Sequence, residues 1–199
     1  MFSRLEEVKP MNVLKGAGTV CLAMTGAYAM AQQTAPARTP PPPPLLMTIA
    51  AFADGATVPV KYSCTPGDAS VSPELKWSQV PAGTQSFALV LSDLDNHPGK
   101  AMVDFPHWIV WNIPGTATSL AEGVPSGATL ADGSHQTGVR GASYLGPCAP
   151  IGPNHHYMWA LYALDTMLTV PSDAKRPDVI KAAEGHVLGA ATWVGVFRK

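Results

Sequence analysis

The sequence predicts a mainly β protein, an antiparallel sandwich or barrel that carries only a few short helices. Short runs rich in β-branched and aromatic residues recur along the chain, and Pro and Gly separate them. Helical signals are scarce by comparison, and no internal repeat is present. Many short strands between turn residues are typical of sandwiches and barrels. The predicted strands cover Leu46–Ala50, Val58–Tyr62, Leu75–Trp77, Phe87–Ser92, His107–Ile113, His156–Leu164 and Gly189–Arg198.

The first three runs are short, and turn residues surround the third. Leu46–Ala50 is mostly apolar, and Val58–Tyr62 alternates, which indicates a half-buried strand. Leu75–Trp77 lies between Ser72-Pro73 and Pro81-Ala82-Gly83, two signals for turns. Each run therefore predicts a strand of only a few residues.

The later runs are longer and more apolar. Phe87–Ser92 has no polar break before its end, so we expect a strand that is covered on both faces. His107–Ile113 stops at Pro114-Gly115, which cannot continue a hydrogen-bonded ladder. Two helices are expected near the C-terminal end, one capped by Ser172-Asp173 and one over Asp178–Glu184 that ends at Gly185.

The charge of the chain argues against nucleic acid as a partner. The 199 residues include 13 basic and 14 acidic side chains, whereas binding driven by phosphate contacts needs a basic stripe. Hydrophobic residues make up 46% of the chain, enough for a core. We expect one domain once the N-terminal segment is set aside.

The N-terminal segment has the pattern of a secretory signal peptide. Lys15 precedes the apolar run GAGTVCLAMTGAYAMA, which ends in a small-x-small sequence before Gln32. We therefore expect a signal peptide over residues 1–31, a Pro-rich linker over 32–46 and a domain over 47–199. Because Glu6 and Glu7 are unusual before a signal peptide, Met11 is an alternative start. The protein is thus predicted to be exported, either periplasmic or secreted.

Two cysteines remain after the predicted signal peptide, Cys64 and Cys148. In an oxidising compartment they can form one disulfide. The alternative is a pair of buried free thiols, because the sequence does not show whether the two residues meet.

Polar and ionisable side chains stand at the ends of three predicted strands. Asp93 and Asp95 continue one face of the strand that starts at Phe87, and His107 begins the next. His155 and Tyr157 share a face at the start of a third. If these ends converge, they form a small pocket in which carboxylates favour protonated imidazoles. Imidazolium and hydroxyl donors suit phosphate or carboxylate oxygens.

Each of these residues also has a structural interpretation. Asp93 can be a turn cap, His107 a hydrogen-bonded core histidine, and Tyr157 a core tyrosine. A metal site is another interpretation, because His and Asp are metal ligands, but no spacing such as HExxH is present. A hydrolase would need a nucleophile, and neither Ser92 nor Ser143 lies in a G-x-S-x-G sequence. We therefore expect neither a metal nor another cofactor.

Four stretches together resemble the bacterial phosphatidylethanolamine-binding protein family, which is YbhB/YbcL-like and Raf kinase inhibitor-like. They occur in the family's order over roughly residues 47–199. The stretches are SPELKWSQVPAGTQSFALVLSDLDNH, HWIVWNIPGTATSLAEGV, YLGPCAPIGPNHHYMWALYALD and GHVLGAATWVGVFRK.

The resemblance implies a β-sandwich with a large antiparallel sheet, a smaller sheet and a few short helices. It also implies a small anion pocket, with a neighbouring glycine in a loop that offers backbone donors. The chain departs from the family pattern at Leu94, His97 and His156, and His156 is expected to face away from the pocket. The implied ligand-binding residues are Asp93, Asp95, His107, Gly146, His155 and Tyr157.

The expected function is therefore non-catalytic binding of a phosphoryl or other anionic group, such as a phospholipid headgroup. One alternative is a hydrolase or lyase that uses His107 and His155 as acid and base. Another is a serine protease inhibitor that presents Arg140 from the polar segment 126–143. Kinase control is not expected of an exported protein, and a homodimer is expected only by analogy with the family.

Overall fold

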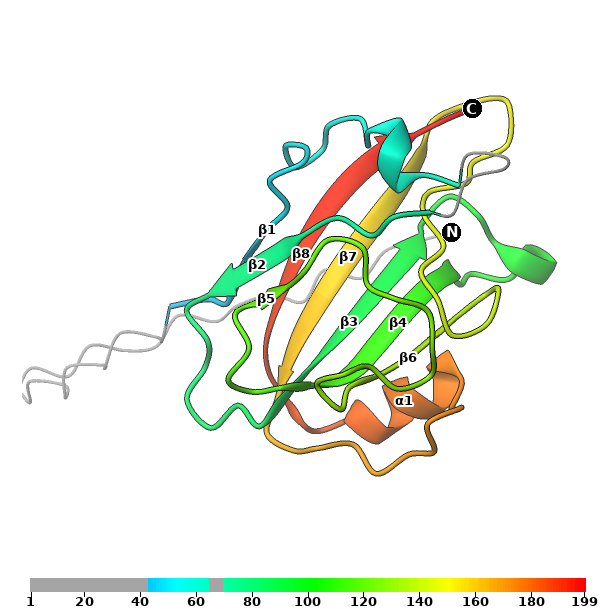
Figure 1. Cartoon of the computed structure of the whole chain (residues 1–199). Helices are drawn as coiled ribbons and strands as arrows, with labels where there is room; N and C mark the ends of the chain where they lie inside the picture. Colours follow the sequence, from blue (N-terminus) through cyan, green and yellow to red (C-terminus); the bar gives the residue numbers. More distant parts are fainter. Residues whose placement is uncertain (1–42, 65–69) are drawn as a thin grey trace, which may run out of the picture. The chain divides into compact units, whose positions relative to one another are not determined.

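The computed structural model describes residues 43–64 and 70–199, which form two antiparallel sheets (Figure 1). The predicted signal peptide and most of the predicted linker lie outside the described residues. Within the described part, no helix is both long and apolar enough to cross a membrane. The small sheet has the order β1 (Leu46–Thr48), β2 (Leu75–Ser78), β5 (Ser119–Leu120). The large sheet has the order β6 (His135–Gly138), β4 (Phe105–Pro114), β3 (Ser86–Asp93), β7 (His155–Leu164), β8 (Val187–Phe197).

This architecture confirms the predicted mainly β fold, with two local corrections. Val58–Tyr62 is not a strand, because Pro59 has no N–H for a ladder and the chain turns into the 3-10 helix η1 (Val60–Tyr62). Ser172-Asp173 does not cap a helix. The chain makes a turn there, and α1 (Arg176–Ala183) begins after Lys175, whose N–H donates to the Asp178 carboxylate at 3.0 Å. The other short helix is η2 (Pro98–Lys100).

The central strand β3 is buried along its whole length, as its unbroken apolar sequence predicted. One face, with Phe87, Leu89 and Leu91, packs into the main core together with residues of the small sheet. The other face, with Ala88 and Val90, belongs to a second apolar cluster that includes residues of α1. The large sheet is thus covered on both faces, and its strand ends are where polar groups can gather.

Strand β4 contains two bulges that change which side chains share a face. Leu91 pairs with Trp108 and Asp93 with Phe105, so two steps along β3 match three steps along β4. The extra residue places His107 on the same side as Trp108, towards Tyr157 and the main core. Regular alternation along β4 would place His107 on the face of Ile109, which belongs to the second apolar cluster, called here the helix-side cluster. The bulge therefore turns the His107 side chain towards Tyr157.

The second bulge lies near Asn112, a residue with φ of 57°. Its side-chain amide donates to the carbonyl of Leu168 at 3.0 Å, and its oxygen accepts the N–H of Leu168 at 2.7 Å. This buried pair of hydrogen bonds ties β4 to the chain that leads into α1.

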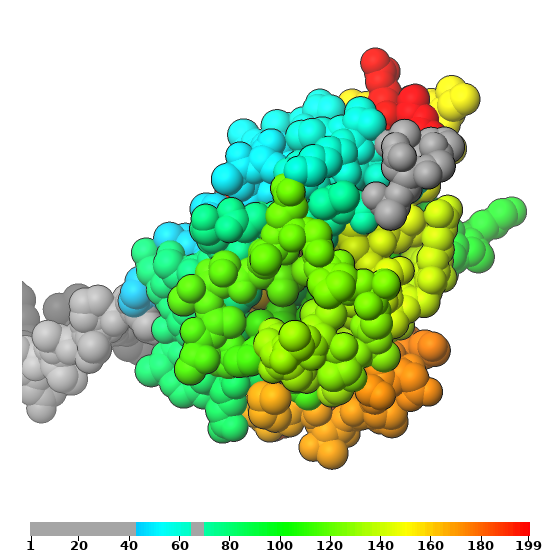
Figure 2. Space-filling view, in the orientation of Figure 1, coloured from blue at the N-terminus to red at the C-terminus, as the bar shows by residue number. Residues whose placement is uncertain are grey.

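The segment 125–143, for which no strand was predicted, contains β6. Gln136 is fully buried, and its amide nitrogen donates to the carbonyls of Pro125 at 2.6 Å and Gly127 at 2.9 Å. Its side-chain oxygen accepts the indole N–H of Trp108 at 2.8 Å. One glutamine thus fixes the segment beside β4, where it forms part of the surface next to α1 (Figure 2).

A disulfide joins Cys64 to Cys148, with 5.2 Å between their Cα atoms. The alternative of two free thiols is thereby wrong. The Cys64 N–H also donates to the carbonyl of Pro147 at 3.0 Å. A Cβ on Gly146 would collide with the carbonyl of Tyr62, so only glycine allows the two segments to lie this close. These contacts hold the loop before β7 against η1.

Removing the disulfide should lower the free energy of unfolding by about 2–4 kcal/mol, because it closes a long loop in the unfolded chain. The separation of 84 residues supports a value near the upper end. Urea unfolding of the wild type and of the Cys64→Ser/Cys148→Ser variant checks this. Reductant should shift the midpoint of the wild type only, and equal midpoints for both proteins would contradict the prediction.

Candidate functional site

Asp93 is the buried carboxylate at the end of β3, where it accepts three hydrogen bonds. One oxygen accepts the N–H groups of Asp95 at 3.0 Å and Asn96 at 3.1 Å. The other accepts Nδ1 of His155 at 2.8 Å. These three donors compensate for the burial of the carboxylate. Asp93 therefore caps the turn, which is one of the interpretations that the sequence left open, and it also holds His155.

His155 comes from the first position of β7 and is the more exposed partner of this pair. Its side chain is 12% exposed, whereas that of Asp93 is 3% exposed. Because Asp93 can only accept at Nδ1, that nitrogen carries the proton. The second ring nitrogen, Nε2, makes no hydrogen bond within the described part of the chain.

His107 is held in a different state by its burial. Its Nδ1 lies 3.2 Å from the carbonyl oxygen of Leu145 and 3.1 Å from that of Gly146, so it donates to both. Burial lowers the pKa of His107, against the opposing effect of these carbonyls and Asp93, and Arg140 lowers it further. His107 is therefore neutral near pH 7. The expectation that a nearby carboxylate protonates the imidazoles is wrong for this histidine, because the desolvation cost is larger.

Tyr157 is fully buried and lies between the two histidines. Its ring centroid is 5.2 Å from that of His107, edge to face, and 6.5 Å from that of His155 in a stacked arrangement. Its hydroxyl oxygen accepts the N–H of Cys148 at 3.1 Å. Burial, together with the nearby Asp93 carboxylate, raises the pKa of Tyr157, so the hydroxyl stays protonated. The tyrosine joins the strand to the disulfide-bonded loop.

Asp95 lies apart from this group, because β3 ends at Asp93 and strand alternation stops there. Its carboxylate is 41% exposed and accepts both the backbone N–H of His156 at 2.6 Å and its Nδ1 at 2.8 Å. Partial burial would raise the pKa of Asp95, but the hydrogen bonds from His156 outweigh it and lower the pKa. Asp95 thus holds the turn after β3 against β7 through His156. His156 is exposed, in agreement with the expectation that it faces away from the pocket.

Gly146 is in contact with the site through its carbonyl oxygen, which accepts from His107. The sequence analysis did not include Phe105 among the residues of the site, although its ring lies 5.5 Å from that of His107, edge to face. Its position two residues before His107 is the signal that could have identified it as a neighbour of that histidine. Arg140 lies at an exposed turn between Gly138 and Gly141, and its charge lowers the pKa of His107. No local pattern in the sequence indicates this effect.

The site brings together Asp93, His107, His155 and Tyr157, with the Gly146 carbonyl beside them. Asp93 and Tyr157 are opposite each other in the β3–β7 ladder, and the bulge supplies His107 from β4. The arrangement combines one accessible imidazole, held by a carboxylate, with one neutral imidazole. Among the described residues, no group of three or more His, Cys, Asp or Glu is placed to hold a metal ion.

Burial of neutral His107 should make the protein less stable in acid. The unfolded chain binds a proton at about pH 6.5, whereas folded His107 binds it only at lower pH, so the free energy of unfolding falls as the pH falls below about 6.5. Urea unfolding between pH 7.5 and pH 5 measures the slope. We expect a shallower slope in His107→Gln than in the wild type. Equal slopes in wild type and His107→Gln would refute the assignment.

Known proteins resemble the chain over the whole of this domain. The family model described as Phosphatidylethanolamine-binding protein matches residues 48–198. A UPF0098 protein of Methanothermobacter thermautotrophicus is 42% identical over 153 residues, which cover 75% of this chain and 95% of that protein. A Mycobacterium tuberculosis protein named as a candidate lipoprotein, LppC, is 38% identical over 177 residues, covering 87% of this chain and 83% of that protein.

Two solved structures are similar in fold. The phosphatidylethanolamine-binding protein homologue CT736 of Chlamydia trachomatis aligns with a TM-score of 0.67 and 29% identity, covering 78% of this chain and 98% of that one. Escherichia coli YbcL, described as a member of the mammalian PEBP family, aligns with a TM-score of 0.65 and 27% identity over the same shares. The match of the family model, the identity to relatives and the two-sheet fold lead to one conclusion: the chain belongs to the phosphatidylethanolamine-binding protein family.

Proposed function

We propose that this protein is a non-catalytic binding protein that holds a phosphoryl or other small anionic group at His155. The observation that carries the proposal is the Asp93–His155 pair, at 2.8 Å. The buried carboxylate fixes the orientation of the imidazole through Nδ1. An imidazolium whose second N–H is free is a charge-assisted donor for an oxyanion. The name of the family is consistent with a phosphate-containing ligand.

The two histidines differ in what they offer such a ligand. His155 is the partly exposed ring and supplies a donor when protonated. His107 is neutral and uses Nδ1 on backbone carbonyls, so its Nε2 is an acceptor. A monoprotonated phosphate has both kinds of group, charged oxygens and one hydroxyl. The pair of histidines therefore favours a phosphoryl group over an anion without a proton to donate.

Export from the cytoplasm is part of the proposal. The disulfide between Cys64 and Cys148 is of the kind that persists in oxidising compartments. One relative carries the name of a candidate lipoprotein, which describes that protein. Fractionation of cells that express the full chain tests this point. Recovery of the protein only in the cytoplasm would contradict export.

Anion binding should stabilise the folded state. At a hundredfold excess over the Kd, bound ligand adds about 2.7 kcal/mol, which raises the Tm by about 5–10 °C for a domain of this size. Thermal unfolding with millimolar phosphate or phosphoethanolamine measures the shift. We expect it to vanish in His155→Ala and in Asp93→Asn, each compared with its own ligand-free form.

The chain offers a matched control for these variants. His186 and Asp165 form a second His–Asp pair at 2.7 Å, but both side chains are 45% exposed. His186→Ala and Asp165→Asn should therefore keep the full shift. No shift in the wild type, or an equal loss in the control variants, would remove the proposal.

The same Asp–His pair also gives a specific reason to test catalysis, since a carboxylate that orients an imidazole is the arrangement of a general base. A hydrolase or lyase acting on phosphoesters is therefore the second candidate. Incubation of the purified protein with a panel of phosphoesters decides between them. Sustained turnover that His155→Ala abolishes would replace the binding proposal, and binding without turnover supports it.

A further inference from the structure

We propose that a cavity on the helix side of the large sheet is a second binding site, which takes a small monocarboxylate with a compact apolar group. The site is separate from the one described above, because none of the four side chains that gather around Asp93 and His155 lines the cavity. Ile109 of the helix-side cluster lines it, whereas Tyr157 belongs to the main core. The inference therefore does not depend on the proposed function.

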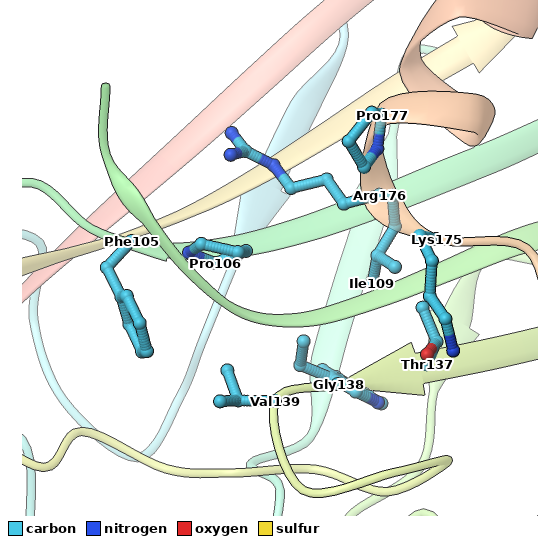
Figure 3. Close-up of a pocket in the computed structure, with 10 residues that line it drawn as sticks. Phe105, Pro106, Ile109, Thr137, Gly138, Val139, Lys175, Arg176 and Pro177 are labelled. Carbon is cyan, nitrogen blue, oxygen red and sulfur yellow. The ribbon is translucent and has the colours of Figure 1, made fainter. Parts of the chain in front are cut away.

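The cavity lies between the β4–β6 edge of the large sheet and the start of α1, and its volume is about 230 Å³ (Figure 3). Val139, Lys175 and Pro177 are exposed, so a ligand can enter from solvent. The walls are mostly apolar and include Phe105, Pro106, Ile109, Val139 and Pro177. Apolar walls with a few polar groups are typical of sites for small molecules.

Three groups at the cavity can donate a hydrogen bond and lack an acceptor. Within the described part of the chain, the ammonium group of Lys175 forms no ion pair and the Thr137 hydroxyl makes no hydrogen bond. The third donor is the Nε–H of Arg176, which is buried and has no partner among the described residues. Because buried donors are rarely left unpaired, this group calls for an acceptor from outside the chain. Carboxylate oxygens are such acceptors.

The polar and apolar parts of the cavity lie at different ends. Figure 3 shows the side chains of Lys175 and Thr137 at one end and Phe105 at the other. Thr137 is the direct partner of Ile109 in the β4–β6 ladder, so both side chains lie on the helix side of the sheet. A carboxylate beside Lys175 therefore leaves its apolar group between Ile109 and Phe105.

The charge of the cavity matches a ligand with a single negative charge. No lining residue in the described part of the chain is acidic. The guanidinium of Arg176 is neutralised by Asp104, which accepts from it at 2.7 and 3.0 Å. Lys175 thus leaves one uncompensated positive charge among the described lining residues. A phosphate dianion would need a second cation, and we therefore assign a monocarboxylate.

The volume of the cavity limits the apolar group. Complete sites for drug-sized ligands are typically about 300–1,000 Å³, and this cavity is smaller. A water molecule takes about 30 Å³ of liquid and a methylene group is of similar size, so the cavity has room for on the order of seven carbon atoms. A medium-length alkyl group or one aromatic ring fits this space.

A second cavity provides an internal comparison. It measures about 210 Å³ and also lies beside α1, but Glu184 lines it and Lys175 does not. A carboxylate should therefore prefer the first cavity. Val139 at the first cavity and Val187 at the second are each 48% exposed. A large side chain at either position can fill the neighbouring space without replacing a core residue.

The size of the ligand is tested by NMR titration with butanoate, hexanoate, octanoate and decanoate. Because the cavity is open on one side, each added methylene is only partly buried and should raise the affinity about two- to threefold. From butanoate to octanoate the gain should be on the order of 30-fold, and decanoate should add little because the cavity is full. Absence of saturable binding, or a gain that continues unchanged to decanoate, would overturn the proposal.

The place of binding is read from the same spectra. Octanoate should shift the backbone amide signals of Thr137 and Val139 and the Nε–H signal of Arg176. Val139→Trp should lose most of the gain with chain length, whereas Val187→Trp should keep it. His155→Ala should bind octanoate as the wild type does. Loss of binding in His155→Ala would place the carboxylate at the other site and would overturn the assignment.

The role of Lys175 is tested by comparing hexanoate with the uncharged hexanamide. The wild type should prefer the carboxylate about two- to fivefold, the range expected for an exposed ion pair. Lys175→Met should bind both equally, and its binding of hexanamide shows that the fold and the cavity are intact. Lys181→Met is the matched control on the same helix and should keep the preference. A preference that survives in Lys175→Met would refute the carboxylate assignment.

A last comparison distinguishes a free acid from the C-terminus of a peptide, since both carry a carboxylate beside an apolar group. The probes are 4-methylpentanoate and N-acetylleucine, and the second adds an amide beside the carboxylate. The amide N–H needs an acceptor, whereas the unpaired groups at the cavity are donors. We therefore expect 4-methylpentanoate to bind more tightly. Tighter binding of N-acetylleucine would overturn the assignment to a free acid.

Discussion

The buried carboxylate of Asp93 is the group around which the polar end of the large sheet is organised. A carboxylate placed at the end of a fully buried strand must be given donors, since an unpaired buried charge would cost several kcal/mol. The structure supplies them from two directions, the turn after β3 and His155 on β7. The turn and the imidazole are therefore fixed by the same group. This coupling explains how a single strand end can both cap a turn and orient a histidine of the candidate site.

The bulge in β4 is the second feature on which the site depends. Without the extra residue, His107 would follow the alternation of Ile109 and face the helix-side cluster. With it, the ring lies against Tyr157 and donates to the carbonyls of the loop before β7. The burial that results keeps His107 neutral, and the two histidines become chemically different. The candidate site thus combines one neutral imidazole with one carboxylate-bound imidazole.

The loop before β7 needs support from outside the sheet, because it has no ladder of its own. The disulfide, the hydrogen bond from Cys64 to Pro147 and the close approach of Gly146 to Tyr62 give that support. Tyr157 then joins the loop to the strand through its hydroxyl. These contacts place the carbonyl of Gly146 where His107 donates to it. An oxidised Cys64–Cys148 pair is thus part of the architecture of the site.

The sequence alone determined most of the strands, because the runs around Phe87, His107 and His156 have strong β-branched and aromatic patterns and ends marked by Pro or Gly. It also indicated the four side chains that gather at the site, through their places at strand ends and the resemblance to a family. It did not reveal β6, since the polar segment 125–143 takes its order from the buried side chain of Gln136. Continuing the alternation past the predicted strand Phe87–Ser92 also placed Asp95 on the face of Asp93, whereas the strand ends at Asp93, where a turn and not alternation sets the direction of the next side chains.

What only the tertiary structure decided is the state and direction of the side chains. The direction in which His107 faces depends on a bulge, and a bulge arises only when β3 and β4 pair. Its neutrality depends on burial, which no local sequence reports. The contact of Phe105 with both His107 and the neighbouring cavity arises where β4, β6 and α1 meet. Residue types and spacing therefore determined which groups are available, and long-range packing determined which of them face one another, because burial and bulges are properties of the assembled sheets.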